Sequence, residues 1–200
     1  MKFKSGLFFY FVVVIVLVLI FLLSEIMIED EMVNYTFYES HYIHLLVNNG
    51  TKIMFAELDK DYGNDENVKS FCHILMHSVG RAAAQKFNTI AEAFKDGKYT
   101  CWSGYYHGVM EGFVAKNESL INNTVINYIC ANLSSGNAYS FDHYNCVHGL
   151  GHGIMYTSEN ELFYSLEVCD RLKETWEKES CYGGVFMENV ISGMNGHETK

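Results

Sequence analysis

The sequence predicts an all-α fold of stacked αα-hairpins, helical-repeat or toroid-like, behind one N-terminal transmembrane helix. Three observations predict it. The 200-residue chain contains no proline, and the part after residue 66 is rich in helix-forming residues. A short phrase that opens with cysteine recurs at Cys72, Cys101, Cys146 and Cys181. Residues 5–24 carry no charge and, as a helix, would be about 30 Å long, the thickness of a bilayer core.

The charges around the apolar run predict its orientation. Lys2 and Lys4 precede it and Glu25 follows it, so we expect residues 1–4 to be a cytoplasmic tail and residues 5–28 a single-pass anchor. A cleaved signal peptide is the alternative. The run is longer than the usual signal core, and residues 24–28 lack small residues at the cleavage positions, which favours the anchor. In both cases the remaining chain is extracytoplasmic.

Cysteine and asparagine usage agrees with export. The six cysteines form an even set, as expected where disulfides persist. Five Asn-x-Ser/Thr sequons predict a glycoprotein, at Asn34, Asn49, Asn117, Asn122 and Asn132. The net charge of −10 argues against nucleic acid as a partner. The membrane is an expected partner, and a protein or glycan is a further candidate.

After the anchor we expect three regions. Residues 29–65 are acidic and predict a membrane-proximal stalk with one short helix near 42–47. Residues 66–192 form the Cys/His-rich helical domain, and residues 193–200 a flexible tail. Apolar periodicity within the domain predicts a first helix over 67–87, whose apolar face continues to 94. Further helices are predicted over 107–115, over 119–133, from 148, over 160–176, and from 183 to about 192. Asn67 or Ser70 is the expected cap of the first.

The positions of the cysteines favour disulfides between neighbours along the chain. Cys169 on one helix and Cys181 at the start of the next would staple a hairpin. Cys130 with Cys146 and Cys72 with Cys101 complete the scheme. Six cysteines permit fifteen pairings, so this scheme is a preference. Zinc ligation by thiolates is the alternative, although the chain has no Cys-x-x-Cys pair.

Histidine and glutamate pairs predict a metal site. Residues four apart lie on one face of a helix, where two side chains can hold a single ion. Such pairs, together with Glu188, make the candidate ligands His73, His77, His107, Glu111, His148, His152 and Glu188. Imidazole and carboxylate suit zinc, iron, copper or manganese as the hypothetical cofactor. The alternative is that these histidines are hydrogen-bonded residues of an ordinary helical core.

Other residues add to this interpretation. Arg81 lies one turn beyond His77 and is a candidate anion-binding residue or a partner of Glu111 or Glu188. Glycines recur in the phrases and predict close helix–helix approach, since each costs about 1 kcal/mol of helix propensity. No Ser/His/Asp hydrolase phrase, phosphate loop, dinucleotide fingerprint or His-Glu-x-x-His motif occurs.

Several phrases resemble those of an uncharacterised exported Cys/His-rich family, over residues 70–190. They are Cys-His-x3-His-x2-Gly-Arg, His-Gly-Val-Met-Glu-Gly, His-Gly-Leu-Gly-His-Gly and Gly-Gly-Val-Phe-Met-Glu-Asn. This resemblance implies no activity. The Cys-x-x-Gly and His-Gly elements are also similar to the zinc-bearing turns of lanthionine-synthetase-like α/α toroids. Those longer proteins carry adjacent Cys-His-Gly ligands that this chain lacks, so no ligand is transferred.

Two functional hypotheses follow. The first is a membrane-anchored extracytoplasmic domain that binds one or two transition-metal ions. If it is an enzyme, a hydrolase or an oxidoreductase, Glu111 or Glu188 would be ligand or general base, the candidate catalytic residues. The second is a disulfide-stapled helical-repeat module that binds protein or glycan without metal. Its groove would be lined by aromatic side chains, namely Trp102, Tyr105, Tyr106 and Tyr182.

Overall fold

The computed structural model describes residues 3–123, 125–133, 139–194 and 199–200. Within the helices, the side chains of residues 3–8, 26–31, 118 and 194 lie outside this description. The described elements are helical, which confirms the all-α class, and none of them is a β-strand. The chain divides into two compact units, Met1–Tyr38 and Glu39–Lys200.

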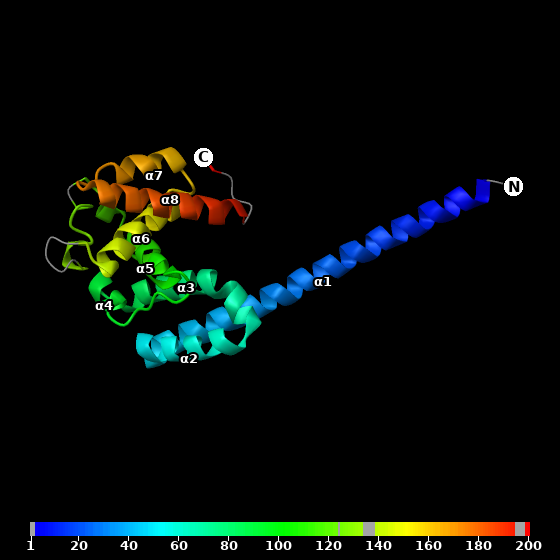
Figure 1. Ribbon diagram of the computed structural model, residues 1–200, viewed down its shortest axis with the longest axis horizontal. Coiled ribbons are helices and arrows are strands. Elements are labelled where there is room, and N and C mark those ends of the chain that lie inside the picture. Colours follow the sequence, from blue (N-terminus) through cyan, green and yellow to red (C-terminus); the bar gives the residue numbers. More distant parts are fainter. Residues whose placement is uncertain (1–2, 124, 134–138, 195–198) are drawn as a thin grey trace. The chain divides into compact units, whose positions relative to one another are not determined.

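The first unit is helical. Helix α1 (Phe3–Asn49, Figure 1) begins in it, and the described side chains from Phe9 to Leu23 are all exposed and mostly apolar. Among the described residues, no helix combines the length and the hydropathy that a membrane crossing requires. Part of the expected anchor, residues 5–8 and 26–28, has no described side chains.

The second unit begins earlier than the sequence suggested. We expected residues 29–65 to be a stalk, but α1 runs to Asn49 and α2 (Thr51–Asn64) follows after Gly50. Gly50 has a φ of 89°, a backbone conformation that favours glycine. Tyr42, Leu46 and the α2 side chains Met54, Phe55 and Leu58 are completely buried. Residues 39–64 therefore form part of the helical domain, because their apolar side chains supply its core.

Helices α3 to α5 form the next part of the domain. Helix α3 (Glu66–Lys86) is capped by the Asp65 side chain, which accepts from two backbone amides, rather than by Asn67 or Ser70. The apolar face does not continue as one helix to Phe94. It breaks at Phe87, and a capping box between Thr89 and Glu92 starts α4 (Ile90–Phe94). Helix α5 (Gly104–Lys116) follows.

The described residues of the segment 119–133 do not form the expected α-helix. They include two 3₁₀ turns, η1 (Glu118–Ile121) and η2 (Ala131–Leu133). Helix α6 (Phe141–Thr157) starts seven residues before His148, because Ser140 caps it. The expected helix 160–176 is shorter, as α7 (Leu162–Cys169), and α8 (Thr175–Met194) starts before Gly183.

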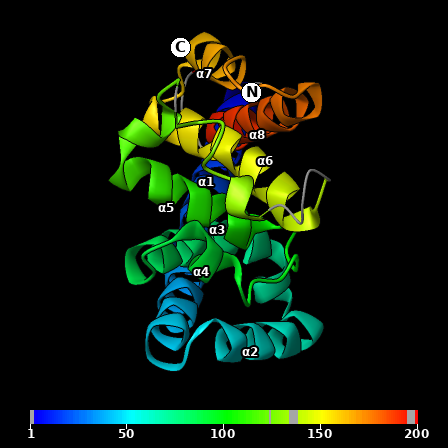
Figure 2. The same cartoon turned by 90° about the vertical axis from the view of Figure 1, so that its left-hand side faces the viewer.

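Four long helices pack as successive neighbours in the order α3, α5, α6 and α8. Figure 2 shows them stacked in that order, with α7 beside α8 and α2 beside α3. Glycines permit the close approach. A Cβ on Gly108 would collide with the backbone carbonyl of His77, and a Cβ on Gly184 with that of His148. The backbones of α3 and α5, and of α6 and α8, are therefore in direct contact at the level of the histidines.

All six cysteines are in disulfides, Cys72–Cys101, Cys130–Cys146 and Cys169–Cys181. These are the pairs that the sequence favoured over thiolate ligation. Three disulfides suggest an oxidising, extracytoplasmic environment. Most of the expected flexible tail, residues 195–198 of 193–200, lies outside the described residues. Lys200 is held by backbone hydrogen bonds to Asn160 and Leu162.

Candidate metal centre

Seven candidate ligands from four helices converge on one region of the domain. They are His73 and His77 of α3, His107 and Glu111 of α5, His148 and His152 of α6, and Glu188 of α8. All are buried except His73, which is half-buried. In three overlapping sets of these residues, the potential ligand atoms lie within 4.8 Å of one another. The structure thus brings together all the histidines and glutamates that the sequence singled out as ligands.

The helical spacing and the helix packing together produce this convergence. On α3 and α6, histidines four residues apart project from the same face, as expected for an α-helix. The glycine contacts then hold α3 against α5 and α6 against α8 at the level of these side chains. Because the backbones touch there, a carboxylate or carbonyl on one helix reaches an imidazole on the next.

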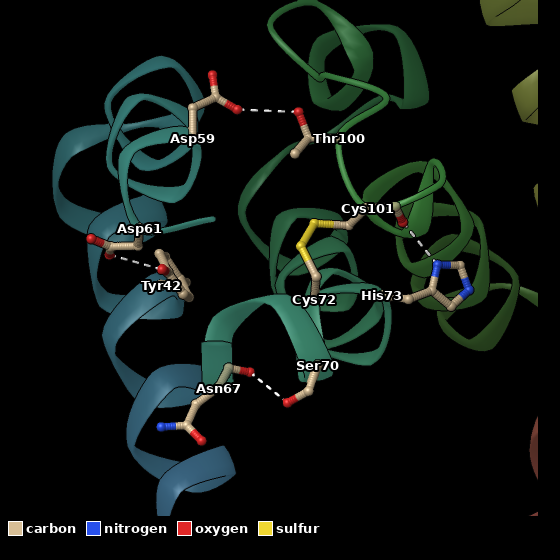
Figure 3. The surroundings of a disulfide bond; sticks show 9 residues. All are labelled: Tyr42, Asp59, Asp61, Asn67, Ser70, Cys72, His73, Thr100 and Cys101. Carbon is tan, nitrogen blue, oxygen red and sulfur yellow. Dashed lines mark hydrogen bonds between the residues drawn. A yellow bond between two sulfur atoms is a disulfide. The ribbon is translucent and has the colours of Figure 1, made fainter. Parts of the chain in front are cut away.

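The two histidines of α3 each donate their Nδ1 hydrogen to an oxygen. Nδ1 of His73 lies 2.9 Å from the backbone carbonyl oxygen of Cys101, next to the Cys72–Cys101 disulfide (Figure 3). A carbonyl oxygen accepts only, so this Nδ1 carries the hydrogen. Nδ1 of His77 lies 2.5 Å from Oε1 of Glu111. The second nitrogen of each ring, Nε2, faces the Nε2 of the other residue at 3.1 Å, within hydrogen-bond distance.

The two histidines of α6 repeat this arrangement. Nδ1 of His148 lies 3.1 Å from the backbone carbonyl oxygen of Ser180 and donates to it. Nδ1 of His152 lies 2.9 Å from Oε2 of Glu188. In metalloproteins, a ligating histidine usually donates its second ring hydrogen to a carboxylate or backbone carbonyl in this way. Four imidazoles of this cluster already have that orientation.

Two ring nitrogens of this cluster are buried and have no hydrogen-bond partner among the described residues. They are Nε2 of His152 and Nδ1 of His107. His152 is completely buried and His107 is 2 % exposed, so these atoms are also shielded from solvent. A buried polar atom without a partner costs free energy, and a bound cation would satisfy both nitrogens.

His107 occupies the middle of the cluster. Its ring stacks on His152 with a centroid distance of 4.2 Å, and it lies 4.9 Å from the ring of His148. On the other side, its centroid is 5.3 Å from that of His77 and 5.5 Å from that of His73. His107 consequently belongs to two sets of possible ligands, one with each histidine pair.

Buried imidazoles in contact with one another are held in the neutral form. Burial, and then the neighbouring imidazoles, hold the pKa of His107 and of His152 well below the usual range. Burial also lowers the pKa of His73 and of His148. Neutral imidazole is the form that binds metal ions, so these four residues need not lose a proton first.

The two carboxylates differ in charge environment. Burial pushes the pKa of Glu111 up, but His77 and Arg81 outweigh that effect and hold it below its usual range. The Arg81 guanidinium lies 2.7 Å from Oε2 of Glu111, one of the pairings that the sequence suggested. The pKa of Glu188 is raised to about 7 by burial and by the nearby charge of Glu111. Glu111 is thus the ionised member of the pair at neutral pH.

Several features of the site had no signal in the sequence. The carbonyl oxygens of Cys101 and Ser180 orient two histidines, but every residue has a carbonyl, so no residue type marks this role. The sequence also suggested a groove lined by aromatic residues. Tyr105 and Tyr106 are buried, whereas Trp102 is 82 % exposed. Tyr182, the fourth residue of that groove, is half-buried, so Trp102 is the one that is largely presented to solvent.

A surface cavity lies beside the α3 end of the cluster. Its volume is about 290 Å³. It is lined by Tyr62, Lys69, Cys72, Tyr99, Thr100, Cys101 and Trp102. The loop that forms part of its wall has positive φ angles at Cys101, Trp102 and Ser103, 63°, 52° and 62°. The same loop supplies the carbonyl that orients His73, which connects the cavity wall to the histidine cluster.

Comparisons with models of protein families, with curated proteins and with solved structures found no match.

Proposed function

We propose that this chain is an exported, membrane-anchored domain whose central helices bind transition-metal ions through imidazole nitrogens. One observation carries this proposal. Four histidines on α3 and α6 have their Nδ1 hydrogens bound to oxygens, which leaves Nε2 as the nitrogen that can bind an ion, and all four belong to sets of possible metal ligands. Such prior orientation removes much of the ordering cost of binding an ion.

The chemistry of the donors narrows the choice of metal. Imidazole suits zinc, copper, iron and nickel, whereas manganese prefers oxygen ligands. Glu111 and Glu188 form one possible ligand set with His77 and His152, but each carboxylate accepts an Nδ1 hydrogen there, so the two all-imidazole sets offer the less engaged donors. Zinc, copper and iron therefore fit the cluster better than manganese does.

The two glutamates then act by positioning the imidazoles. Each carboxylate accepts the Nδ1 hydrogen of a histidine and so makes the opposite nitrogen a better donor to an ion. We assign Glu111 and Glu188 this orienting role in place of the general-base role considered from the sequence. Arg81 balances the charge of Glu111, which explains its position one turn beyond His77.

Elemental analysis of the full chain, purified in detergent without added chelator, tests the proposal. We expect stoichiometric zinc, copper or iron in the wild type and at least a ten-fold lower content in His152→Ala. His143→Ala is the matched control, since His143 is on the same helix and pairs with Glu177 at 3.0 Å, outside the cluster. Metal-free wild-type protein that is folded would overturn the proposal.

The location of the domain is a separate part of the proposal. The uncharged run 5–24, the flanking charges and the disulfides support an N-terminal anchor with the domain outside the cytoplasm. Protease added to intact cells should remove the domain of residues 39–200 while a cytoplasmic marker survives. Protection of the domain until the cells are lysed would contradict this topology.

A metal-independent binding module is the second candidate function. The exposed Trp102 beside the 290 Å³ cavity favours it, because exposed aromatic side chains are common binding anchors for protein and glycan partners. Under this alternative, the metal-free domain would be fully folded, and Trp102→Ala would abolish partner binding. Loss of folding on removal of metal would argue against it.

A further inference from the structure

The histidine cluster consists of two matching halves. In each half, the first histidine donates Nδ1–H to a backbone carbonyl, as His73 does to Cys101 and His148 to Ser180. The second donates Nδ1–H to a carboxylate on the next helix, as His77 does to Glu111. His152 does the same to Glu188. Each half therefore has its own pair of Nε2 atoms, and nothing in this pattern requires the two pairs to serve one ion.

In the half of the cluster on α3, formed by His73 and His77, the two Nε2 atoms lie close together. Nε2 of His73 and Nε2 of His77 are 3.1 Å apart. Two ligands of one metal ion, with metal–nitrogen bonds of about 2.0–2.1 Å in a tetrahedral site, are separated by about 3.3 Å. The two nitrogens share a hydrogen bond when no ion is bound, and an ion that replaced its proton would find them close to the spacing of two ligands.

The half of the cluster on α6, formed by His148 and His152, contains a buried nitrogen without a partner. Nε2 of His152 is fully buried and has no partner within the described residues. His148 and His152 form a set of three potential ligands with His107, while His73 and His77 form another set with the same residue. His107 is the shared neighbour of the two halves, and its buried Nδ1 is also without a described partner.

Charge and coordination number indicate which ions would occupy both halves. Glu111, Glu188 and Arg81 are the charged groups in contact with the cluster, and Arg81 balances Glu111. Two neighbouring divalent ions repel each other four times as strongly as two univalent ions at the same separation. Zinc is usually four-coordinate, so two zinc ions would need water or carboxylate ligands in addition to the five imidazoles, whereas univalent copper accepts two or three ligands. Five imidazoles alone can complete the coordination of two copper(I) ions, and the engagement of both carboxylates by Nδ1 hydrogens favours copper over zinc here.

We propose that the cluster holds two copper(I) ions side by side, one on the His73–His77 pair and one on the His148–His152 pair, with His107 between them. This inference rests on the proposed metal-binding function and specifies its occupants. All six cysteines are in disulfides, so no thiolate competes for copper in the folded chain. The two ions are unequal in access, because His73 is half-buried while His152 is completely buried.

Titration of the chelator-treated full chain with copper(I) tests the proposal. The titration uses ascorbate as reductant, no thiol and a chromophoric chelator as competitor, so that the disulfides persist. We expect two ions per chain in the wild type and in His143→Ala. One ion should remain in His73→Ala and one in His148→Ala. In the wild type, the more accessible ion should exchange to the chelator at least ten-fold faster, and His73→Ala should lack that fast phase.

The outcomes separate this proposal from the proposed function. A single copper ion in the wild type, or a bound metal other than copper with no copper uptake, overturns the two-ion proposal and leaves metal binding intact. Absence of every metal overturns both. X-ray absorption of the copper-loaded wild type needs no variant. It should show nitrogen ligands only, with a copper–copper distance, and sulfur coordination would contradict the assignment.

Discussion

Nε2 of His77 lies 3.1 Å from Nε2 of His73, although the Nδ1 hydrogen of each ring is bound to an oxygen. At this separation the two nitrogens share a hydrogen bond, since two lone pairs directed at each other would repel without a proton or a cation between them. The contact between these two residues therefore marks a position that a proton occupies when no ion is bound and that the proposed metal ion would take over.

Glu111→Gln tests the buried charge network. Glu111 accepts from His77 and pairs with Arg81 while its own side chain is 1 % exposed. The amide removes the negative charge and leaves Arg81 without its buried partner, so we expect the free energy of unfolding to fall by about 3 kcal/mol. Chemical denaturation of the metal-free chain measures this change.

The control for this variant is Glu159→Gln. Glu159 pairs with Lys200 at 3.3 Å, but its side chain is 84 % exposed. The free energy of unfolding should therefore fall by less than about 1 kcal/mol. Equal losses in the two variants would show that Glu111 has no special part in the domain's stability.

Gly184→Ala tests the close contact between α6 and α8. A Cβ at this position would collide with the backbone carbonyl of His148, so the helices must separate, at a cost of about 1–3 kcal/mol. Gly63→Ala is the matched control within a helix. Its Cβ would meet nothing within 4 Å, and we expect a gain of about 0.5–1 kcal/mol from reduced backbone freedom. Thermal unfolding of both variants should show changes of opposite sign.

Acid should destabilise the metal-free domain. The pKa values of His73, His107, His148 and His152 are lowered in the folded state, so the unfolded chain binds more protons as the pH falls through 6.5. The free energy of unfolding should therefore fall between pH 7.5 and pH 5.5.

Protonation of Glu188 has the opposite effect on the free energy of unfolding. Its pKa is raised to about 7 from 4.5, so the folded state binds the extra proton between these values, and stability falls as the pH rises through that window. Glu188→Gln removes this opposing effect and should make the loss in acid steeper. Denaturation at several pH values measures both slopes, and an unchanged slope in Glu188→Gln would contradict the raised pKa.

The disulfide pairing has a direct test. A non-reduced digest should contain a peptide that joins Cys169 to Cys181, which are twelve residues apart. Replacing both with serine should lower the free energy of unfolding by about 3 kcal/mol, because the unfolded chain gains freedom. Free thiols at these positions in exported protein would exclude the bridge.

The sequence alone was enough for the local features of this domain. Helix geometry places His73 with His77, and His148 with His152, on one face whatever surrounds them, so their spacing predicted ligand pairs. The disulfide scheme also followed from positions along the chain, because bridges between neighbouring helix ends need little knowledge of the fold. The prediction of an α-helix over 119–133 was wrong, because the apolar spacing of this segment did not outweigh turns such as that at Asn122.

Tertiary structure alone decided how the ligand pairs are used. The order of the packed helices places Glu111 behind His77 and Glu188 behind His152, which turns candidate ligands into orienting groups. The carbonyl of Ser180, which carries no signature in the sequence, fixes the free nitrogen of His148. The physical reason is distance. A hydrogen bond requires atoms about 3 Å apart, and that separation between segments remote in sequence exists only after the helices have packed.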